Sequence, residues 1–461
     1  MGKKYDFDYI IIGSGPAGRT AALNLAKARK HVAVVECYAF GGADLNTRDL
    51  PYTYSLDFAH TFYKINRHKA LSGQDFHFNF PSLIAGQNNV VALAQKNYKA
   101  PLDDAGVEFI DGYASFLNPN TITVSGKEYT AANFILATGT ELKTGNIVGL
   151  DTVNYLTPDT AIKIRRLPEF VFIIGGGPTG CEIAEYYAKL GTRVLIMEKN
   201  PRLLPREDKE VSEELTKYFE NELGIMVIAG ARVVAIEQDD ISKRVVFNTN
   251  GQEKMVRVDC IVLATGSTPF VSLDLEKAGV KYKNTGVIVD KYFQTSAKNI
   301  FAIGDVAYSP DIDPSFSSTE HSEYEASVLT SNLIHKTKTP ASFNGFIRSI
   351  STEPEIAVIG ANERDLALRN QKAKKSITYL KDLYIGGIAS QEYGFIKILT
   401  DAAGHILGAS IVAPNAKIIA EELSLAIRHR ITIMEIASTP HPTDNYTQAI
   451  KFAAKNLLVR K

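Results

Sequence analysis

Two short apolar runs along the chain are each followed directly by a glycine-rich turn. The first run, residues 9–12, reads Tyr-Ile-Ile-Ile, and the second, residues 170–174, reads Phe-Val-Phe-Ile-Ile. Unbroken apolar runs of this length are typical of strands buried on both faces of a parallel sheet. A helical stretch follows each turn, to residue 30 in the first copy and residue 190 in the second, and another strand comes after it. The pattern therefore predicts an internal repeat of strand, turn, helix and strand.

The glycines of both turns have the spacing of a dinucleotide-binding motif. Each turn reads Gly-x-Gly-x-x-Gly, and each later strand ends in a glutamate 18 positions after the third glycine. The first glycine permits a tight turn, the second lets a pyrophosphate approach the backbone, and the third lets helix and strand pack closely. The pyrophosphate lies at the positive helix N-terminus, and the glutamate accepts hydrogen bonds from a ribose. The predicted binding residues are Gly13, Gly15, Pro16, Ala17, Gly18 and Glu36 in the first copy, and Gly175, Gly177, Gly180 and Glu198 in the second.

The last quarter of the chain has a different pattern. Each copy of the repeat is followed by a strand that ends in Ala-Thr-Gly, at residues 137–139 and 264–266. From about residue 340, strands at 394–399 and 406–412 precede helical stretches at 416–428 and 446–459. This order predicts an α+β unit rather than a third nucleotide fold. The predicted fold class is therefore α/β, with two Rossmann-like dinucleotide-binding domains and a C-terminal α+β domain.

Composition excludes several classes of partner. Lys plus Arg and Asp plus Glu each number 51, so no global charge favours nucleic acid or a membrane surface. Three cysteines, at positions 37, 181 and 260, lie far apart, which fits a reducing cytoplasm and excludes a cysteine-rich metal site. No apolar run approaches the length of a membrane span, and no long apolar leader precedes the first strand. We therefore expect a cytoplasmic protein without a resident metal.

Together the motifs resemble the pyridine nucleotide-disulfide oxidoreductase family, and most of all dihydrolipoamide dehydrogenase and its relatives. The resemblance also rests on residues 299–306, on residues 352–356 (Thr-Glu-Pro-Glu-Ile) and on residues 441–443 (His-Pro-Thr). It implies FAD at the first motif, NAD at the second, and a homodimer. The implied domains are FAD-binding segments at 1–150 and 269–339, an NAD-binding domain at 151–268 and a dimerisation domain at 340–461. It further implies cofactor contacts at Gly42, Ala114, Thr138, Gly139, Gly266 and Asp305, the last holding the ribityl chain of the flavin.

The resemblance breaks at the redox centre. The family reads Gly-Gly-Thr-Cys-Leu-Asn-Val-Gly-Cys-Ile-Pro-Ser-Lys, whereas residues 41–53 read Gly-Gly-Ala-Asp-Leu-Asn-Thr-Arg-Asp-Leu-Pro-Tyr-Thr. Both cysteines are replaced, by Asp44 and Asp49, and the family lysine beside the flavin is replaced by Thr53. Cys37, Cys181 and Cys260 fall elsewhere, and we expect them to be small packing residues. Dithiol chemistry is therefore not expected.

Of the other catalytic residues that the resemblance implies, some are retained and one is replaced. The family motif His-Pro-Thr-x-x-Glu supplies an acid-base histidine and its carboxylate from the partner subunit. His441 is present, but Tyr446 stands at the carboxylate position, so we expect a histidine without its orienting acid. Glu182 matches a family residue beside the nicotinamide. The candidate catalytic residues are thus Asp44, Asp49, Glu182 and His441.

Three functions remain open from the sequence. The first is an FAD enzyme that oxidises NADH and passes electrons to a small acceptor such as a quinone or dioxygen. NADH is favoured because Glu198 would repel the extra phosphate of NADPH, although Lys199, Arg202 and Arg206 lie nearby. A carboxylate beside a reduced flavin either takes up a proton or lowers the flavin potential. The second is a non-catalytic or regulatory FAD- and NAD-binding scaffold, and the third a flavoenzyme that uses Asp44, Asp49 or His441 as acid-base for an organic substrate.

Overall fold

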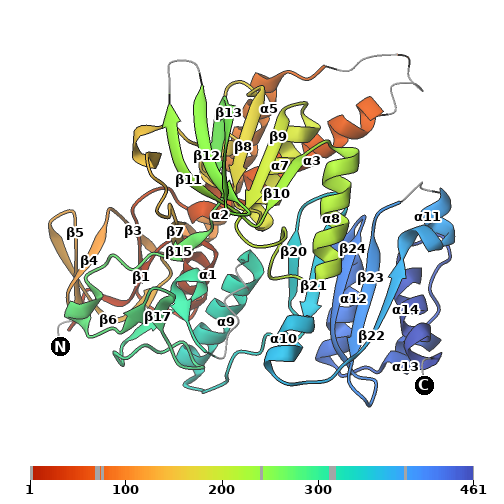
Figure 1. The fold of residues 1–461 in the computed structure, drawn as a ribbon. Coiled ribbons are helices and arrows are strands. Elements are labelled where there is room, and N and C mark those ends of the chain that lie inside the picture. The colour runs from red at the N-terminus through yellow and green to blue at the C-terminus, as the bar shows by residue number, and fades with distance from the viewer. Residues whose placement is uncertain are drawn as a thin grey trace. The chain divides into compact units, whose positions relative to one another are not determined.

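The computed structural model describes residues 4–67, 73, 77–238, 242–310, 318–388 and 392–459. The chain forms two compact units (Figure 1). Unit 1 comprises Met1–Ser55, Asn79–Lys143 and Gly266–Ser342, and unit 2 comprises Leu56–Phe78, Thr144–Thr265 and Phe343–Lys461. The finer division into four domain segments stays a prediction.

Unit 1 is built around a seven-stranded sheet in the order β3-β2-β1-β6-β5-β4, with β18 paired to β6. Pairs among β3, β2, β1, β6 and β18 are parallel, whereas β4 and β5 return antiparallel. Residues 9–12 are buried because β1 lies between two parallel neighbours. The strands are β1 (Phe7–Ile12), β2 (Val32–Glu36), β3 (Glu108–Asp111), β4 (Ala114–Asn118), β5 (Thr121–Val124), β6 (Lys127–Leu136) and β18 (Ile300–Ala302).

Helices α1 and α9 of unit 1 pack against each other. Helix α1 ends earlier than expected, because Arg29 takes up a left-handed conformation with φ +61°. The helices of this unit are α1 (Pro16–Lys27), α2 (Gly42–Asn46), α5 (Phe80–Asp104), α9 (Thr319–His335), η2 (Leu275–Ala278) and η3 (Gly304–Val306). Helix α3 (Asp49–Arg67) begins in unit 1 and ends in unit 2. Small strands complete the unit: β7 (Thr140–Leu142) with β15 (Ser267–Pro269), and β17 (Gly286–Ile288) with β16 (Tyr282–Lys283) and β19 (Ala307–Tyr308).

Unit 2 repeats the parallel arrangement in a four-stranded sheet, in the order β10-β9-β8-β14. Every residue of β8 is buried, as its unbroken apolar run predicts. The strands are β8 (Phe170–Ile174), β9 (Arg193–Glu198), β10 (Met226–Ala229) and β14 (Cys260–Leu263), with helices η1 (Leu150–Thr152), α6 (Pro158–Ala161), α7 (Pro178–Lys189) and α8 (Lys209–Glu222). A separate antiparallel sheet contains β11 (Ala231–Gln238), β12 (Lys243–Thr249) and β13 (Gln252–Val258).

The C-terminal part of unit 2 is an antiparallel five-stranded sheet in the order β20-β21-β24-β23-β22. Helix α12 packs on β21 and β24, and α14 packs on β22 and β23, so the apolar core lies between the helices and the sheet. The strands are β20 (Ile347–Ile350), β21 (Glu355–Gly360), β22 (Lys374–Tyr379), β23 (Phe395–Thr400) and β24 (Ile406–Ala413). The helices are α10 (Glu363–Leu368), η4 (Leu380–Asp382), α11 (Tyr384–Ile388), α12 (Ala416–Arg428), α13 (Ile433–Ser438) and α14 (Gln448–Val459). The predicted α/β class with a C-terminal α+β part is confirmed.

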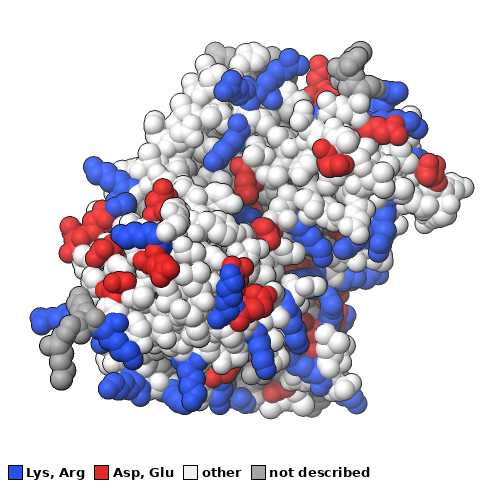
Figure 2. Space-filling model, turned by 90° about the vertical axis from the view of Figure 1, so that its left-hand side faces the viewer, with Lys and Arg blue, Asp and Glu red and all other residues white. Residues whose placement is uncertain are grey.

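The surface has no dominant sign of charge on the face that Figure 2 shows. Lys and Arg side chains are interspersed with Asp and Glu side chains and separated by uncharged surface, in keeping with a formal net charge of +0. Within the described ranges, no helix combines the length and the apolar character that crossing a bilayer requires. Charged ligands must therefore be met by local groups.

Candidate functional site

The first glycine turn, between β1 and α1, has no room for a side chain at two of its three glycines. Gly13 has φ +105°, and a Cβ atom there would lie 2.3 Å from the carbonyl oxygen of Ala137. A Cβ atom at Gly18 would lie 1.9 Å from the Gly13 oxygen. Gly15, which caps α1, has nothing within 4 Å in the corresponding direction. The open side of the turn therefore leaves space for a pyrophosphate at the helix N-terminus.

Glu36, at the end of β2, lies beside this turn. Its carboxylate accepts hydrogen bonds from the backbone N–H and the hydroxyl of Ser14, at 3.0 and 2.6 Å. It also accepts from the backbone N–H groups of Cys37 and Tyr38, at 2.9 and 3.0 Å. These bonds fix the carboxylate at the carboxyl edge of the sheet, where a ribose hydroxyl would be met.

Gly42, Thr138 and Gly139 lie close to the same turn. A Cβ atom on Gly42 would lie 3.0 Å from the Cα atom of Gly15. Thr138 donates its hydroxyl to the Phe270 carbonyl at 2.7 Å, and the Phe270 N–H donates to Gly139 at 3.0 Å. Parallel neighbours β1 and β6 end at one edge of the sheet, which explains why an Ala-Thr-Gly segment accompanies a glycine turn.

Asp305 lies in η3, which packs against α9. The backbone N–H of Gly304 donates to the buried carboxylate of Glu325 at 2.6 Å. Burial, with a contribution from the charge of Asp305, raises the pKa of Glu325 to about 7. The other residues predicted for this side are Pro16 and Ala17, which begin α1, and Ala114, which begins β4.

The second turn, between β8 and α7, has the same close approaches at its glycines as the first. Gly175 has φ +115°, and a Cβ atom there would lie 2.2 Å from the Ala264 oxygen. A Cβ atom at Gly180 would lie 1.9 Å from the Gly175 oxygen, and Gly177 again has nothing within 4 Å. Gly266 has φ +92°. Both turns thus fit a dinucleotide: each has a cradle that only glycine can form and an open helix N-terminus.

Glu198, at the end of β9, is buried and fully engaged by the chain. Its carboxylate accepts hydrogen bonds from the Gly176 N–H at 2.7 Å and from the Asn200 N–H at 2.8 Å. The Asn200 side-chain amide donates to it as well. Glu198 therefore has the same position relative to its turn as Glu36, and it accepts three hydrogen bonds from the chain where Glu36 accepts four.

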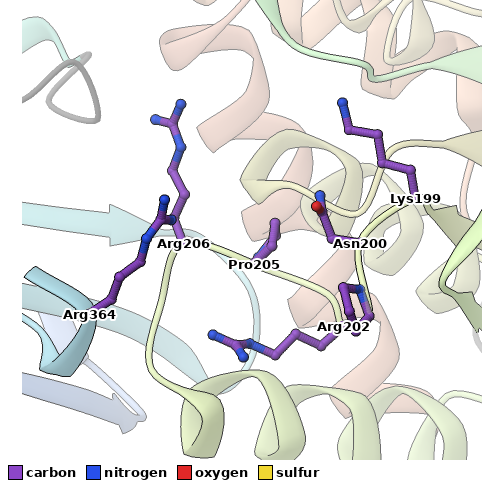
Figure 3. Close-up of a pocket in the computed structure, with 7 residues that line it drawn as sticks. Lys199, Asn200, Arg202, Pro205, Arg206 and Arg364 are labelled. Atoms are coloured by element: carbon purple, nitrogen blue, oxygen red, sulfur yellow. The ribbon is translucent and has the colours of Figure 1, made fainter. Parts of the chain in front are cut away.

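A cavity of about 450 Å³ is lined in part by the residues that follow Glu198 in sequence (Figure 3). Its lining residues include four cations and no acid: Lys199, Asn200, Pro201, Arg202, Pro205, Arg206 and Arg364. Arg364 reaches in from α10, and the Arg206 carbonyl accepts a hydrogen bond from Asn362 at 2.8 Å. In the part of the chain that the structure describes, no carboxylate pairs with Lys199, Arg206 or Arg364. Such a cavity can hold an anion such as a phosphate group.

Asp44 and Asp49 come together although they belong to different helices, α2 and α3. The Thr319 hydroxyl lies 2.7 Å from Asp44 Oδ1 and 2.5 Å from Asp49 Oδ2. Arg19 forms a salt bridge with the other oxygen of Asp44 at 2.7 Å, and both side chains are largely buried. Removal from water, together with the charge of Asp44, raises the pKa of Asp49 to about 6. The pair can therefore hold a proton near neutral pH.

His441 does have a carboxylate partner, so the expectation of an unpaired histidine is wrong. Its Nε2 lies 3.1 and 3.2 Å from the two oxygens of Glu422, and its Nδ1 lies 2.9 Å from the Thr439 carbonyl. The imidazole is 3 % exposed. Glu422 belongs to α12, which precedes His441 in sequence. The family motif places the carboxylate after the histidine, so it could not predict this partner. Tyr446 packs against the apolar core instead.

Glu182 in α7 lies beside the segment that precedes β21. Its Oε1 accepts a hydrogen bond from the Ser351 N–H at 2.7 Å. Thr53, which the resemblance places at the family's lysine position, lies in α3 and is exposed. The carboxylate of Glu182 is thus held by backbone, and it lies in unit 2, whereas Asp44 and Asp49 lie in unit 1.

All three cysteines are free. Cys181 is completely buried, as a packing residue would be, and burial raises its pKa well above the usual value. Burial raises the pKa of Cys260 to about 11. Cys37 is exposed, so the packing role expected for it is wrong: it follows the last residue of β2, where the chain leaves the sheet. Raised pKa values make weak nucleophiles of these thiols.

Two groups of side chains come within metal-binding reach of one another among the described residues. They are His60 with Glu185 and Glu353, and Asp208 with Glu210 and Glu363. In each, the Nζ atom of a buried lysine already contacts two or more of the carboxylates: Lys189 in the first and Lys397 in the second. The ammonium groups supply the positive charge that a metal would bring.

Several contacts in these sites could not be found from local sequence. Arg19 and Thr319 lie far from Asp44 along the chain, and Arg364 belongs to the C-terminal part. Only the cavity had a signal in the local sequence, because several cationic residues follow Glu198.

Comparisons with known proteins match most of the chain to one family. Residues 7–326 match the pyridine nucleotide-disulphide oxidoreductase family, and residues 347–454 match the dimerisation domain of that family. Mercuric reductase from Bacillus cereus is 30% identical over 455 residues, which cover 97% of this chain and 71% of that protein. Dihydrolipoyl dehydrogenase from Thermus scotoductus is 31% identical over 469 residues, covering 98% of this chain and 97% of that protein.

Solved structures share the fold. The flavoprotein disulfide reductase RclA from Escherichia coli, in its Cu(II) complex, has a TM-score of 0.87 at 22% identity, with 100% of both chains covered. LpdA from Mycobacterium tuberculosis has a TM-score of 0.85 at 23% identity, covering 97% of this chain and 99% of that one. The family match covers most of the sequence and includes both glycine turns. The chain therefore belongs to the pyridine nucleotide-disulphide oxidoreductase family, whose members use FAD and NAD(P)H.

Proposed function

We propose that this protein oxidises NAD(P)H through bound FAD and passes the electrons to a small acceptor that is not a disulfide. The carboxylate pair carries this proposal. Asp44 and Asp49 stand at the two positions where the family sequence has its redox cysteines, and Thr319 joins them. Carboxylates cannot accept electrons, and the three remaining thiols are free and have raised pKa values. Electrons must then leave without passing through protein sulfur.

FAD is assigned to the first turn. Residues that would hold it are Gly13, Gly15, Pro16, Ala17, Gly18, Glu36, Gly42, Ala114, Thr138, Gly139 and Asp305. Bound FAD would supply hydride exchange between the nicotinamide and the acceptor. The protein contributes binding, orientation and protons. Glu182 and His441 remain proposed catalytic residues, with Glu422 positioning the histidine.

The second turn is assigned to the nicotinamide dinucleotide, through Gly175, Gly177, Gly180, Glu198 and Gly266. Glu198 argues for NADH, because a carboxylate disfavours a nearby phosphate. The cavity beyond it argues for NADPH, because three cations there, which pair with no carboxylate among the described residues, would meet the 2′-phosphate. We propose that the cavity outweighs Glu198, whose charge is already engaged by Gly176 and Asn200, so that NADPH is accepted as well as NADH.

A homodimer is also proposed. Beside the match to a dimerisation domain, helices α12 and α14 expose large apolar side chains, such as Ile418 at 73% and Val459 at 80% exposure. Apolar side chains of this size are typical of surfaces that another subunit covers. Size-exclusion chromatography with light scattering should give twice the chain mass of 50.5 kDa.

Anaerobic titration of the FAD-loaded protein with NADH and NADPH tests the main proposal. We expect the flavin absorbance to bleach, and to return when a quinone is added. The double variant Cys37→Ser/Cys260→Ser should behave like the wild type, because neither sulfur is on the proposed route. No bleaching with either nucleotide would reject the enzyme and favour the regulatory scaffold. Loss of turnover in the double variant would reject the sulfur-free route.

A further inference from the structure

We propose that Asp49 donates a proton to the acceptor, and that the acceptor is an uncharged organic molecule with a carbonyl or quinone oxygen that becomes protonated on reduction. This inference rests on the proposed function and narrows its unknown acceptor. It is carried by the arrangement of Asp44, Asp49, Thr319 and Arg19.

The contacts of the Thr319 hydroxyl indicate how many protons the two aspartates share. It lies within 2.7 Å of one oxygen from each aspartate, and it has a single hydrogen to donate. If both aspartates were ionised, one of these two contacts would bring lone pairs face to face without a hydrogen between them. Two short contacts are satisfied together when one carboxyl group is protonated and donates to the hydroxyl oxygen, while the hydroxyl donates to the other. The pair therefore holds one proton.

Arg19 decides which aspartate carries the proton. Its guanidinium lies 2.7 Å from Asp44 Oδ2 in a setting where the side chains are 5 and 10 % exposed, so Asp44 is held as the anion. Arg19 also stacks on Tyr98, at 4.4 Å from the ring centre, and contacts Glu323 at 3.1 Å. No cation contacts Asp49 among the described residues in a comparable way. The proton accordingly resides on Asp49.

Two acidic groups near Asp49 favour this assignment, and two nearby arginines contact other residues. Asp44 on α2 and Glu320 on α9 both raise its pKa, after the larger effect of removal from water. Arg19 on α1 is engaged by Asp44, and Arg48, just before α3, has its guanidinium 3.4 Å from Thr140. Asp49 is nevertheless an exposed residue, so a small molecule and solvent can approach it.

The proton requirement defines the class of acceptor. Reduction of a carbonyl or quinone adds two electrons and two hydrogens, one delivered as a hydride by way of bound FAD and one as the proton that leaves Asp49 Oδ2. The C=O bond becomes C–OH, Asp49 is left as a carboxylate, and water restores its proton. The ionised Asp44 disfavours anionic acceptors at the same place, since like charges repel. An uncharged acceptor fits both conditions.

Infrared difference spectroscopy of the oxidised FAD-loaded protein tests whether Asp49 is protonated, and it does not require turnover. Beside the bands of protonated Glu185 and Glu325, the wild type should show the C=O stretch of one further protonated carboxyl group, identified by the difference from Asp49→Asn, that disappears as pH rises through about 6. Asp49→Asn should lack this band, and Asp57→Asn, an exposed aspartate on the same helix, should keep it. A wild type without this further band at pH 5, or the same band retained in Asp49→Asn, would overturn the proposal. This readout does not depend on whether NAD(P)H reduces the flavin.

A pair of acceptors tests the transfer. With 1,4-naphthoquinone, Asp49→Asn should lose about 100-fold in turnover, the size typical of a missing general acid. With ferrocenium, which takes one electron and no proton, the variant should match the wild type and Asp57→Asn. Equal losses with both acceptors would overturn the proposal. Failure of NAD(P)H to bleach the wild-type flavin would instead reject the proposed function. The infrared result would still show whether Asp49 carries a proton.

Discussion

In the first glycine turn, Glu36 is followed by Cys37 and by Tyr38, which is 85% exposed. In the second, Glu198 is buried and followed by a cavity with four cationic side chains. The backbones of the two turns are otherwise alike, since a Cβ atom at the third glycine would meet the first glycine's oxygen at 1.9 Å in both. The glycines thus leave the same room at both turns, and we propose that the charges beyond the acidic residue distinguish one dinucleotide from another.

The largest expected effects come from the third glycines. Gly18→Ala should prevent FAD binding, because the new Cβ atom would overlap the Gly13 oxygen. Gly180→Ala should keep FAD and lose flavin reduction by NAD(P)H, because only the second turn is damaged. Flavin absorbance per chain and anaerobic titration measure the two effects.

Alanine at Gly15 or Gly177 provides the control, because nothing lies within 4 Å of the new atom. Those variants should fold normally, as judged by circular dichroism, and bind their own dinucleotide less tightly. Flavin reduction at the normal rate in Gly180→Ala would show that the second turn does not bind the nicotinamide nucleotide.

The second effect concerns two buried glutamates whose pKa values are both raised to about 7, Glu325 in unit 1 and Glu185 in unit 2. Since 4.5 is the ordinary value, the folded state binds more protons than the unfolded state between pH 4.5 and 7, and stability falls as pH rises through this window. Glu325→Gln removes that loss and keeps an acceptor for Gly304. It should stabilise the protein by about 3 kcal/mol at pH 8 and by little at pH 5.

Glu185→Gln should gain less than Glu325→Gln at pH 8. The substitution removes an ionised buried carboxylate, but that carboxylate lies 2.8 Å from the buried ammonium of Lys189, whose charge is then left with Glu353 alone. At pH 5, where Glu185 is protonated, the substitution should change stability little. Urea unfolding of the FAD-loaded proteins at pH 5 and 8 measures both variants. Equal shifts in the two would mean that burial alone, and not the partner, governs these carboxyl groups.

The smallest predicted effect separates the coenzymes. Arg206→Ala and Arg364→Ala should each lower kcat/KM for NADPH about tenfold, which corresponds to a loss of about 1.4 kcal/mol in transition-state stabilisation. The kcat/KM for NADH should be nearly unchanged. The NADPH effect should shrink at high salt, because exposed charges are screened. Lys209→Ala, which removes an exposed lysine outside the cavity lining, is the matched control. Equal losses of kcat/KM with NADH and with NADPH would indicate that the cavity does not bind the 2′-phosphate.

Local sequence was sufficient for the repeated strand, turn and helix. Residues 9–12 and 170–174 form strands because burial on both faces requires unbroken apolar runs, and glycine spacing depends on neighbours a few positions apart. The start of α14 at Gln448 and the end of α1 at Lys27 differ by two or three residues from the expected bounds. Helix ends depend on single backbone conformations that periodicity does not report.

The partners of the site residues were beyond the reach of the sequence. Thr319 bonds to Asp44 across 275 positions, and Glu422 bonds to His441 from a helix before it. Such contacts depend on how helices pack, and no local pattern encodes them. A motif therefore located Asp44, Asp49 and His441, and the fold alone revealed what their side chains touch.

A site that uses Asp44 and Asp49 in place of redox cysteines, as we propose, would have a consequence for the resistance of the protein to chemical damage. Aspartate is not alkylated by thiol reagents under mild conditions, is not oxidised by peroxide or hypochlorous acid, and binds soft heavy metals weakly. An enzyme that works through Asp44 and Asp49 would continue to turn over where thiol-dependent reductases are poisoned. Iodoacetamide or an arsenical would find Cys37 as the exposed target, outside the proposed route of the electrons.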